Sequence, residues 1–342
     1  MSKITSFKTG KTIIIAEGCD NHFGSLDNAK KMVINAKKAG ADVIKFQHHL
    51  PDEEMLPAVP KSKNFKISLY NFLKKYSLTL QQHENIKNFC KKKKIQYLCT
   101  PFSLKAALEL REIGVEWFKI GSGEFTDYPF IREVIKMGKP TILSTGMSSQ
   151  KEIYDIYNFL KKYKKNQIAF MNCTSEYPPR INDINLKFLG VMKKNFKDFV
   201  IGHSDHTNTI ETSIAAVALG AKIIEKHVYL KGKNFGPDRD VSISFDQLRT
   251  LVSSIRNIEK ALGKEKKVYP KEKIIRKWAT RSLIAKKNIK KGELISKSKI
   301  WSIRPGTGIP SKYYDNVIGT KAKKFIKKNE LLKKNHITIK IT

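Results

Sequence analysis

The sequence predicts an α/β protein, namely a (β/α)8 barrel followed by a small β-rich domain. Short β-branched segments alternate with amphipathic segments up to about residue 262, and this alternation yields eight strand candidates. Beyond that point the pattern changes to short strands and turns, which indicates a second domain. No G-x-G-x-x-G motif follows the first strand, so a doubly wound dinucleotide-binding sheet is disfavoured.

The expected barrel elements follow one another in regular order. The strand candidates are residues 12–16, 42–46, 96–99, 116–120, 141–144, 168–171, 198–201 and 222–225. Helical candidates lie between them at residues 26–39, 80–92, 104–113, 151–163, 209–219 and 245–262. The connection at residues 47–79 is long and carries acids, prolines and aromatics, so we expect a lid or a dimer segment there.

The domain boundaries are expected from the change in pattern. Residues 1–262 form the predicted TIM barrel, residues 263–278 a Lys- and Pro-containing linker, and residues 279–342 the small domain. Its expected strands are residues 281–285, 289–294, 301–304 and 326–332.

The charge balance is strongly basic. Lys and Arg number 66 against 31 Asp and Glu, a formal net charge of +35. The lysines are spread over nearly every expected helix, which favours a solvated surface over a nucleic-acid site, so no nucleic-acid partner is expected. Such a surface still attracts anionic substrates.

Other features limit the location of the protein. The sequence contains no apolar run of about 18 residues and no evident secretory signal, so we expect a cytoplasmic protein without a membrane partner. The four cysteines, Cys19, Cys90, Cys99 and Cys173, are widely spaced and form no CxxC pair. They are expected to be reduced thiols.

Polar residues follow every expected strand, where a barrel of this type places its active site. In chain order they include Glu17, Lys45, Thr100, Lys119, Ser122, Glu124, Ser144, Ser175, Tyr177, Ser204, His206 and His227. One such residue is ordinary loop polarity, but eight strand ends in succession predict a catalytic centre.

The residue types indicate two kinds of binding. Lys45 and Lys119 supply positive charge for a small dianion, for which phosphate is the best candidate. The hydroxyls of Thr100, Ser122, Ser144 and Ser204 are expected to surround the same anion.

The second kind of site is a metal centre. His206 and His227 end neighbouring strands and are expected to bind one divalent ion, supported by Asp205 and Asp238. Glu17 and Glu124 are candidates for hydroxyl recognition or proton transfer.

Short motifs at the strand ends resemble those of the bacterial sialic acid synthases, which make N-acetylneuraminic, legionaminic and pseudaminic acids. The motifs are IAEGCDNHFGS (15–25), KFQ (45–47), TPFS (100–103), FKIGSGE (118–124), LSTGM (143–147), CTSEYP (173–178), SDHT (204–207) and GPD (236–238). The tail, with IRPGTG at 303–308, resembles the family's SAF (antifreeze-like) domain.

The resemblance implies condensation of phosphoenolpyruvate with an N-acetylated hexosamine to a nine-carbon 2-keto acid and phosphate. It assigns phosphoenolpyruvate to Lys45, Thr100, Lys119, Ser122, Ser144, Ser175 and Ser204, and a Mn2+ or Mg2+ ion to His206 and His227. It assigns the sugar to Glu17, Glu124, Tyr177, Asp238 and Arg304. The catalytic residues it implies are Glu17, Lys119, His206 and His227. It also implies a domain-swapped homodimer in which Arg304 reaches the partner's barrel.

Some positions depart from the family pattern. Ser175 and Glu176 stand where N-acetylneuraminate synthases commonly have Asn and an aliphatic residue, and Phe23 replaces a common polar residue. The sugar is therefore expected to be either N-acetylmannosamine or a diacetamido-dideoxyhexose. Two other functions stay open, a pyruvate aldolase with Lys119 as Schiff base and a non-catalytic protein that binds polyanions.

Overall fold

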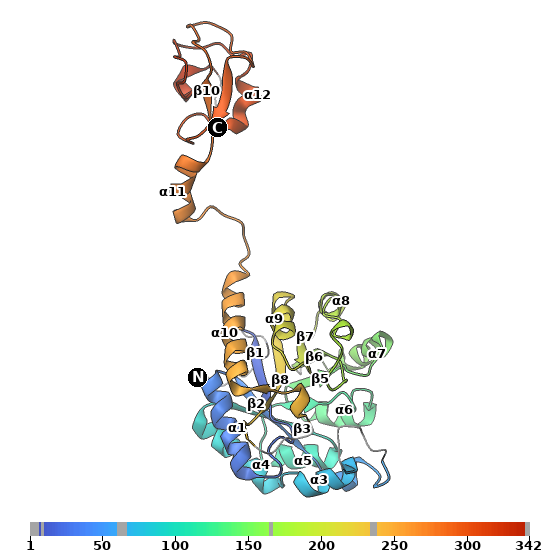
Figure 1. The fold of residues 1–342 in the computed structure, drawn as a ribbon. Helices are drawn as coiled ribbons and strands as arrows, with labels where there is room; N and C mark the ends of the chain where they lie inside the picture. The colour runs from blue at the N-terminus through green and yellow to red at the C-terminus, as the bar shows by residue number, and fades with distance from the viewer. Residues whose placement is uncertain (1–6, 8–9, 60–66, 164–166, 233–237, 339–342) are drawn as a thin grey trace. The chain divides into compact units, whose positions relative to one another are not determined.

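The computed structural model describes residue 7 and residues 10–59, 67–163, 167–232 and 238–338. Residues Gly236 and Pro237 of the GPD motif lie outside this part of the chain. The chain divides into two compact units, Met1–Gly263 and Lys264–Thr342 (Figure 1). Each unit has a hydrophobic core of its own.

Unit 1 is the predicted (β/α)8 barrel. Its strands are β1 (Ile13–Glu17), β2 (Val43–His48), β3 (Gln96–Pro101), β4 (Phe118–Ile120), β5 (Thr141–Ser144), β6 (Ile168–Cys173), β7 (Val200–Asp205) and β8 (Ile223–Tyr229). They pair in sequence order, all parallel, and β1 pairs with β8 to close the barrel. A two-residue strand, β9 (Ile243–Ser244), adds to the end of β8.

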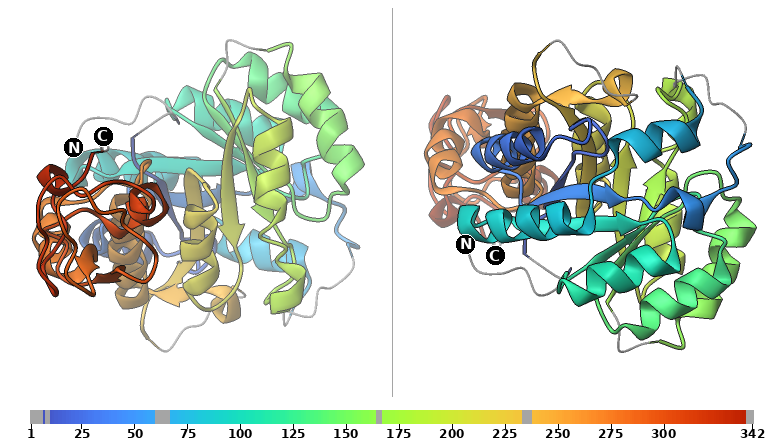
Figure 2. Two further views of the ribbon diagram at one scale, coloured as in Figure 1. Left: turned by 90° about the horizontal axis from the view of Figure 1, so that it is seen from above. Right: turned by 90° about the horizontal axis from the view of Figure 1, so that it is seen from below.

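Helices surround the strands of unit 1 (Figure 2). They are α1 (Leu26–Ala39), α2 (Pro51–Glu54), α3 (Leu69–Tyr76), α4 (Leu80–Lys93), α5 (Leu104–Glu112), α6 (Tyr128–Lys136), α7 (Gln150–Leu160), α8 (Phe188–Asn195), α9 (Glu211–Ala218) and α10 (Phe245–Ala261). The first begins as the sequence predicts, because the Ser25 side chain accepts from Asn28 N and caps it. It ends at Gly40, whose φ of 90° suits glycine.

The barrel interior is filled from one end by apolar side chains, here called the apolar plug. The plug consists of Phe7, Ile13, Ile15, Val43, Leu98, Trp117, Ile142, Ala169, Met171 and Ile223. A larger core lies between the strands and the surrounding helices. Because the plug occupies the interior at the start of the strands, the space near their carboxyl ends is left to polar residues.

Unit 2 is small and rich in β-structure. Helix α11 (Pro270–Ala279) begins in the segment expected as a linker and ends one residue beyond it, and β10 (Ser282–Ala285) pairs antiparallel with β11 (Ile300–Ile303). Isolated bridges, such as Ile289 with Ile326, join the other expected strands. A short helix, α12 (Tyr314–Val317), completes the unit. Among the described residues, every helix is too short or too polar to cross a lipid bilayer.

Candidate active site

The mouth of the barrel continues the inward rows of the apolar plug. Glu17 comes two residues after Ile15, and Lys45 comes two residues after Val43. Because side chains on a strand alternate between faces, both point into the barrel. The same spacing directs the following residues inward: Thr100, Lys119, Ser144, Ser204, Glu225 and His227.

Two lysines and two carboxylates form a buried ionic cluster at this level. Lys45 Nζ lies 2.7 Å from Glu17 Oε2 and 3.0 Å from Glu225 Oε2. Lys119 Nζ lies 3.3 Å from Glu225 Oε1 and donates to Ser144 Oγ at 2.6 Å. Glu225 therefore bridges the two lysines, and all four charged side chains are buried.

The electrostatics of the cluster follow from burial and charge. Burial raises the pKa of the Glu225 carboxyl, but the ammonium groups of Lys119 and Lys45 outweigh burial and hold this pKa well below its usual range. Burial lowers the pKa of Lys45 to about 7, against the opposing effect of Glu225. An anion that enters the mouth has to compete with Glu17 and Glu225 for the lysines.

Hydroxyl groups line the same space. Ser204 Oγ donates to Glu225 Oε1 at 3.0 Å, next to the contact that Glu225 makes with Lys119. Thr100 Oγ1 is buried and has no hydrogen-bond partner among the described residues. A buried hydroxyl without a partner is costly, and a bound oxyanion would satisfy it.

Gly146, in the loop after β5, leaves room for a cradle of small polar side chains. A Cβ at this position would lie 2.2 Å from Ser175 Oγ, 2.7 Å from Ser122 Oγ and 3.2 Å from Cys173 Sγ. Ser122 Oγ also contacts Cys173 Sγ at 3.7 Å. Ser122 and Ser175, both expected to bind phosphoenolpyruvate, thus lie together, with Cys173 beside them.

The two predicted metal-binding histidines lie together. The rings of His206 and His227 have centroids 5.1 Å apart and are inclined at 76°. His206 Nδ1 donates to Thr174 O at 2.8 Å, because a carbonyl oxygen only accepts. This fixes the proton on Nδ1, so the Nε2 lone pair is left to accept from Tyr177 Oη at 3.3 Å or to bind a metal.

The residues around His227 also fit a divalent ion. His227 Nδ1 is buried, has no hydrogen-bond partner among the described residues and lies 3.6 Å from Asp238 Oδ2. Burial, together with His206, holds the pKa of His227 well below its usual value, so the ring is neutral, as a ligand must be. A neutral imidazole nitrogen beside a carboxylate is a donor pair that suits Mn2+ and similar ions.

Asp205 does not support the metal site, contrary to the expectation from sequence. Its Oδ2 lies 3.1 Å from Lys226 Nζ and accepts hydrogen bonds from Thr212 and Ser213, both at 2.6 Å. Since Ser204 points into the barrel, the next side chain on β7 points outward, toward α9. Asp205 therefore connects strands β7 and β8 to helix α9.

The residues predicted to bind the sugar lie in different parts of the structure. The Tyr177 ring packs against the His206 ring, with centroids 4.4 Å apart and planes inclined at 33°. Glu124 Oε2 is buried without a hydrogen-bond partner among the described residues, and burial raises the Glu124 pKa to about 7. Arg304 belongs to unit 2, where it is exposed and its Nε donates to Ala279 O at 3.0 Å. Its role in sugar binding stays a prediction.

Three residues of the mouth have no predicted role in the site. Glu225 is the last residue of the expected strand 222–225, and its place two residues before His227 puts both on one face. Cys19 and Cys173 were expected only as reduced thiols. All four cysteines are unpaired, and Cys19 lies close to His227 and Asp238.

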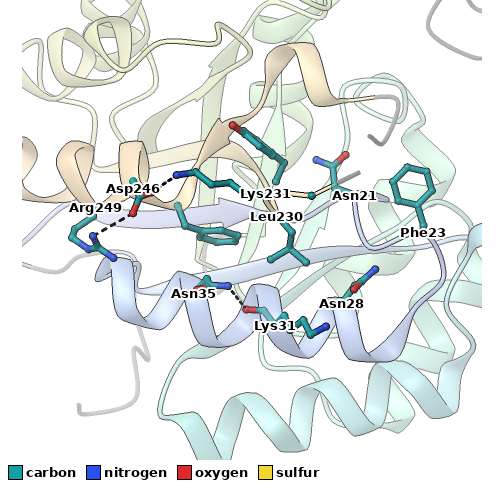
Figure 3. Close-up of a pocket in the computed structure, with 12 residues that line it drawn as sticks. Asn21, Phe23, Asn28, Lys31, Asn35, Leu230, Lys231, Asp246 and Arg249 are labelled. Carbon is teal, nitrogen blue, oxygen red and sulfur yellow. Dashed lines mark hydrogen bonds and ion pairs between the residues drawn. The ribbon is translucent and has the colours of Figure 1, made fainter. Parts of the chain in front are cut away.

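A separate cavity lies outside the ionic cluster, between α1 and the start of α10 (Figure 3). Its volume is about 500 Å³, and its lining includes Asn28, Lys31 and Phe245. Two of its cations, Lys231 and Arg249, pair with Asp246 at 2.7 and 3.4 Å. None of the predicted site residues lines it.

Comparison with known proteins agrees with this geometry. A model of the NeuB family matches residues 32–267, and a model of the SAF domain matches residues 280–338. N,N'-diacetyllegionaminic acid synthase from Campylobacter jejuni is 38% identical, covering 94% of this chain and 99% of that protein. Pseudaminic acid synthase from the same species is 36% identical, covering 97% of this chain and 98% of that protein.

A solved structure extends the likeness to three dimensions. N-acetylneuraminic acid synthetase from Leptospira borgpetersenii matches with a TM-score of 0.71 at 32% identity, covering 78% of this chain and 90% of that chain. The family match spans most of the barrel, and the curated relatives span nearly the whole chain. The chain therefore belongs to the NeuB family and carries a SAF domain after its barrel.

Proposed function

We propose that this protein is a nonulosonic acid synthase, which condenses phosphoenolpyruvate with an N-acetylated hexosamine to a nine-carbon 2-keto acid and phosphate. One observation carries the proposal: the Lys45–Glu225–Lys119 cluster lies in the same barrel mouth as the His206–His227 pair. The condensation needs both a site for a phosphate ester and a means of polarising an aldehyde.

The lysines and hydroxyls act on the phosphate end. Carbon C3 of phosphoenolpyruvate attacks the sugar aldehyde, water adds at C2, and phosphate leaves with the electron pair of the C2–O bond. Lys45 and Lys119 stabilise the charge on the departing dianion, and burial strengthens their effect. The hydroxyls of Thr100, Ser122, Ser144, Ser175 and Ser204 supply further donors.

Glu17 is the candidate base for the water that adds at C2. Its carboxylate is buried, and Lys45 holds it at 2.7 Å. In the barrel register Glu17 lies level with Lys45 on β2 and with His227 on β8, between the two parts of the site. It is therefore positioned to hold a proton released during addition.

A divalent ion, Mn2+ or Mg2+, is proposed to bind His206 and His227. When bound, it supplies Lewis acidity toward the aldehyde oxygen. The Thr174 carbonyl orients the His206 ring for this role.

The sugar is proposed to contact Glu124, Tyr177 and Asp238, with Arg304 from the SAF domain of a partner subunit on its N-acyl group. This arrangement requires a domain-swapped homodimer. Glu124 Oε2 is buried and has no hydrogen-bond partner in the described part of the chain, so it can accept a hydrogen bond from a sugar hydroxyl or amide.

The experiment that tests the proposal is phosphate release from phosphoenolpyruvate, with and without Mn2+, over a panel of sugars. The panel includes N-acetylmannosamine and a diacetamido-dideoxyhexose, because one relative is named for N,N'-diacetyllegionaminic acid. We expect release only with a sugar present, and loss of release in Lys119→Met. Absence of release with every acetamido sugar, together with tight polyanion binding, would favour the non-catalytic alternative.

The aldolase alternative is tested by trapping. In a Schiff-base enzyme, borohydride with pyruvate leaves a stable adduct on Lys119. We expect no such adduct, because Lys119 Nζ donates to Ser144 Oγ and pairs with the Glu225 carboxylate.

A further inference from the structure

A cysteine joins the histidine and carboxylate at the proposed metal site. One ligand atom from each of Cys19, His227 and Asp238 lies within 4.8 Å of the others. Metal–ligand bonds of 2.0–2.3 Å place tetrahedral ligands roughly 3–4 Å apart, so a small side-chain rotation closes this set around one ion. His227 Nδ1 and Asp238 Oδ2, at 3.6 Å, already have that spacing.

The backbone holds the Cys19 thiol in this position. Cys19 lies in the loop after β1, is fully buried and has a φ of 36°. Its side chain lies close to His227 and Asp238. Its N–H donates to Glu17 Oε1 at 2.6 Å, and Gly18 N donates to Lys45 O at 2.8 Å. The Cys19 thiol lies beside the Asp238 carboxylate. The sulfur is thus directed at the same carboxylate that lies beside His227.

The other sulfur near the site is less well placed. Cys173 Sγ lies 4.0 Å from His206 Nδ1, the nitrogen that carries a proton and donates to Thr174 O. A sulfur on that side of the ring is away from the Nε2 lone pair.

We infer that Cys19 is a metal ligand together with His227 and Asp238, and that its thiolate gives this site a preference for thiophilic divalent ions. Thiolate ligands favour Zn2+ and similar ions over Mg2+, which binds oxygen. The inference rests on the proposed metal site of the synthase. It predicts tighter binding of Zn2+, Co2+ and Cd2+ than of Mg2+ to the whole protein.

Cobalt(II) spectroscopy of the full-length protein tests this without reference to activity. We expect a near-ultraviolet sulfur-to-cobalt charge-transfer band in the wild type and its loss in Cys19→Ser. Cys19→Gly serves as a second variant, because glycine accepts the positive φ and keeps the loop intact. Cys90→Ala is the matched control. Cys90 is a buried residue of helix α4, so its replacement should leave the band unchanged.

Cadmium titration gives the size of the effect. We expect Cys19→Ser to weaken Cd2+ binding at least about tenfold, with Mg2+ binding changed much less. A wild-type complex without the band, or a band that persists in Cys19→Ser and Cys19→Gly, overturns the inference. A band lost only in Cys173→Ser overturns it as well.

Phosphate release with Mn2+ is measured on the same samples. Release without the cobalt band would refute the Cys19 ligand and leave the proposed function standing. A Cys19-dependent band without phosphate release in the presence of any tested sugar would support the Cys19 ligand and contradict the proposed function.

Discussion

Glu225 sets the charge balance of the barrel mouth, because it contacts both lysines of the proposed phosphate site. The change Glu225→Gln removes this charge, so that Lys45 keeps its pair with Glu17 and Lys119 keeps its hydrogen bond to Ser144. We expect the free energy of unfolding to fall by about 3–5 kcal/mol, the usual cost of breaking a buried ion pair. Inorganic phosphate should bind the variant more tightly than the wild type, since one competing carboxylate is gone.

Urea unfolding and phosphate titration measure both effects. Asp246→Asn is the control, because its exposed pairs with Lys231 and Arg249 should contribute at most about 1 kcal/mol. Unchanged phosphate affinity in Glu225→Gln would contradict the role given to this cluster.

Gly146 tests the hydroxyl cradle. In Gly146→Ala the new Cβ would lie 2.2 Å from Ser175 Oγ and displace it. We expect the KM for phosphoenolpyruvate to rise at least about tenfold, the factor that corresponds to 1.4 kcal/mol of lost binding. Gly190→Ala is the matched control, because nothing lies within 4 Å of a Cβ there. Equal KM values for the two variants would remove the cradle from the site.

Glu124 makes stability depend on pH in a defined direction. Folding raises its pKa from 4.5 to about 7, mainly through burial, with His49, Glu54 and Lys119 nearby. Between these values the folded protein binds more protons than the unfolded chain, so this carboxyl lowers the free energy of unfolding as pH rises. In Glu124→Gln this loss is absent, and above pH 7 the variant should gain of order 1–3 kcal/mol relative to wild type.

Urea unfolding of both proteins across this pH range measures the difference. Because the other titrating groups are shared, they largely cancel. A constant stability difference between pH 4 and pH 8 would show that the Glu124 pKa is not raised.

At the scale of elements, strand β8 separates two roles by alternation. Glu225 and His227 point into the barrel, whereas Lys226 pairs with Asp205 and donates to Thr207 O. We expect Lys226→Met to reduce the free energy of unfolding by about 3–5 kcal/mol, because Asp205 loses its buried partner. KM values for both substrates should stay within the range of the wild type. A stable variant that no longer binds phosphoenolpyruvate would place Lys226 in the site.

The barrel strands could be predicted from sequence because each is a short, mostly apolar segment that is followed by polar residues. The helix predicted at residues 26–39 is α1, whose capping Ser25 and terminal Gly40 are local signals. The predicted role of Asp205 at the metal site was wrong because side chains alternate along β7: Ser204 points into the barrel, so Asp205 points outward. The bridging role of Glu225 depends on lysines from two other strands, and no local pattern contains it.

At the scale of the whole molecule, the prediction concerns Arg304 in the SAF domain. We expect Arg304→Ala to raise the KM for the sugar and leave the KM for phosphoenolpyruvate unchanged. Arg281→Ala, an exposed arginine of the same unit, is the control. If Arg304 acts across a dimer, mixing Arg304→Ala with His227→Ala should restore activity, because one barrel in the hybrid receives both intact residues. No recovery after subunit exchange would contradict action in trans.

The central claim is that the barrel mouth joins phosphoenolpyruvate to an amino sugar with release of phosphate. Its most direct test uses phosphoenolpyruvate labelled at the oxygen between C2 and phosphorus, with a sugar that supports turnover. Because the C2–O bond breaks in the proposed reaction, the label should appear in the released phosphate, beside one equivalent of a nine-carbon 2-keto acid. Label retained in the keto acid, or phosphate released without a sugar, would contradict the proposed reaction.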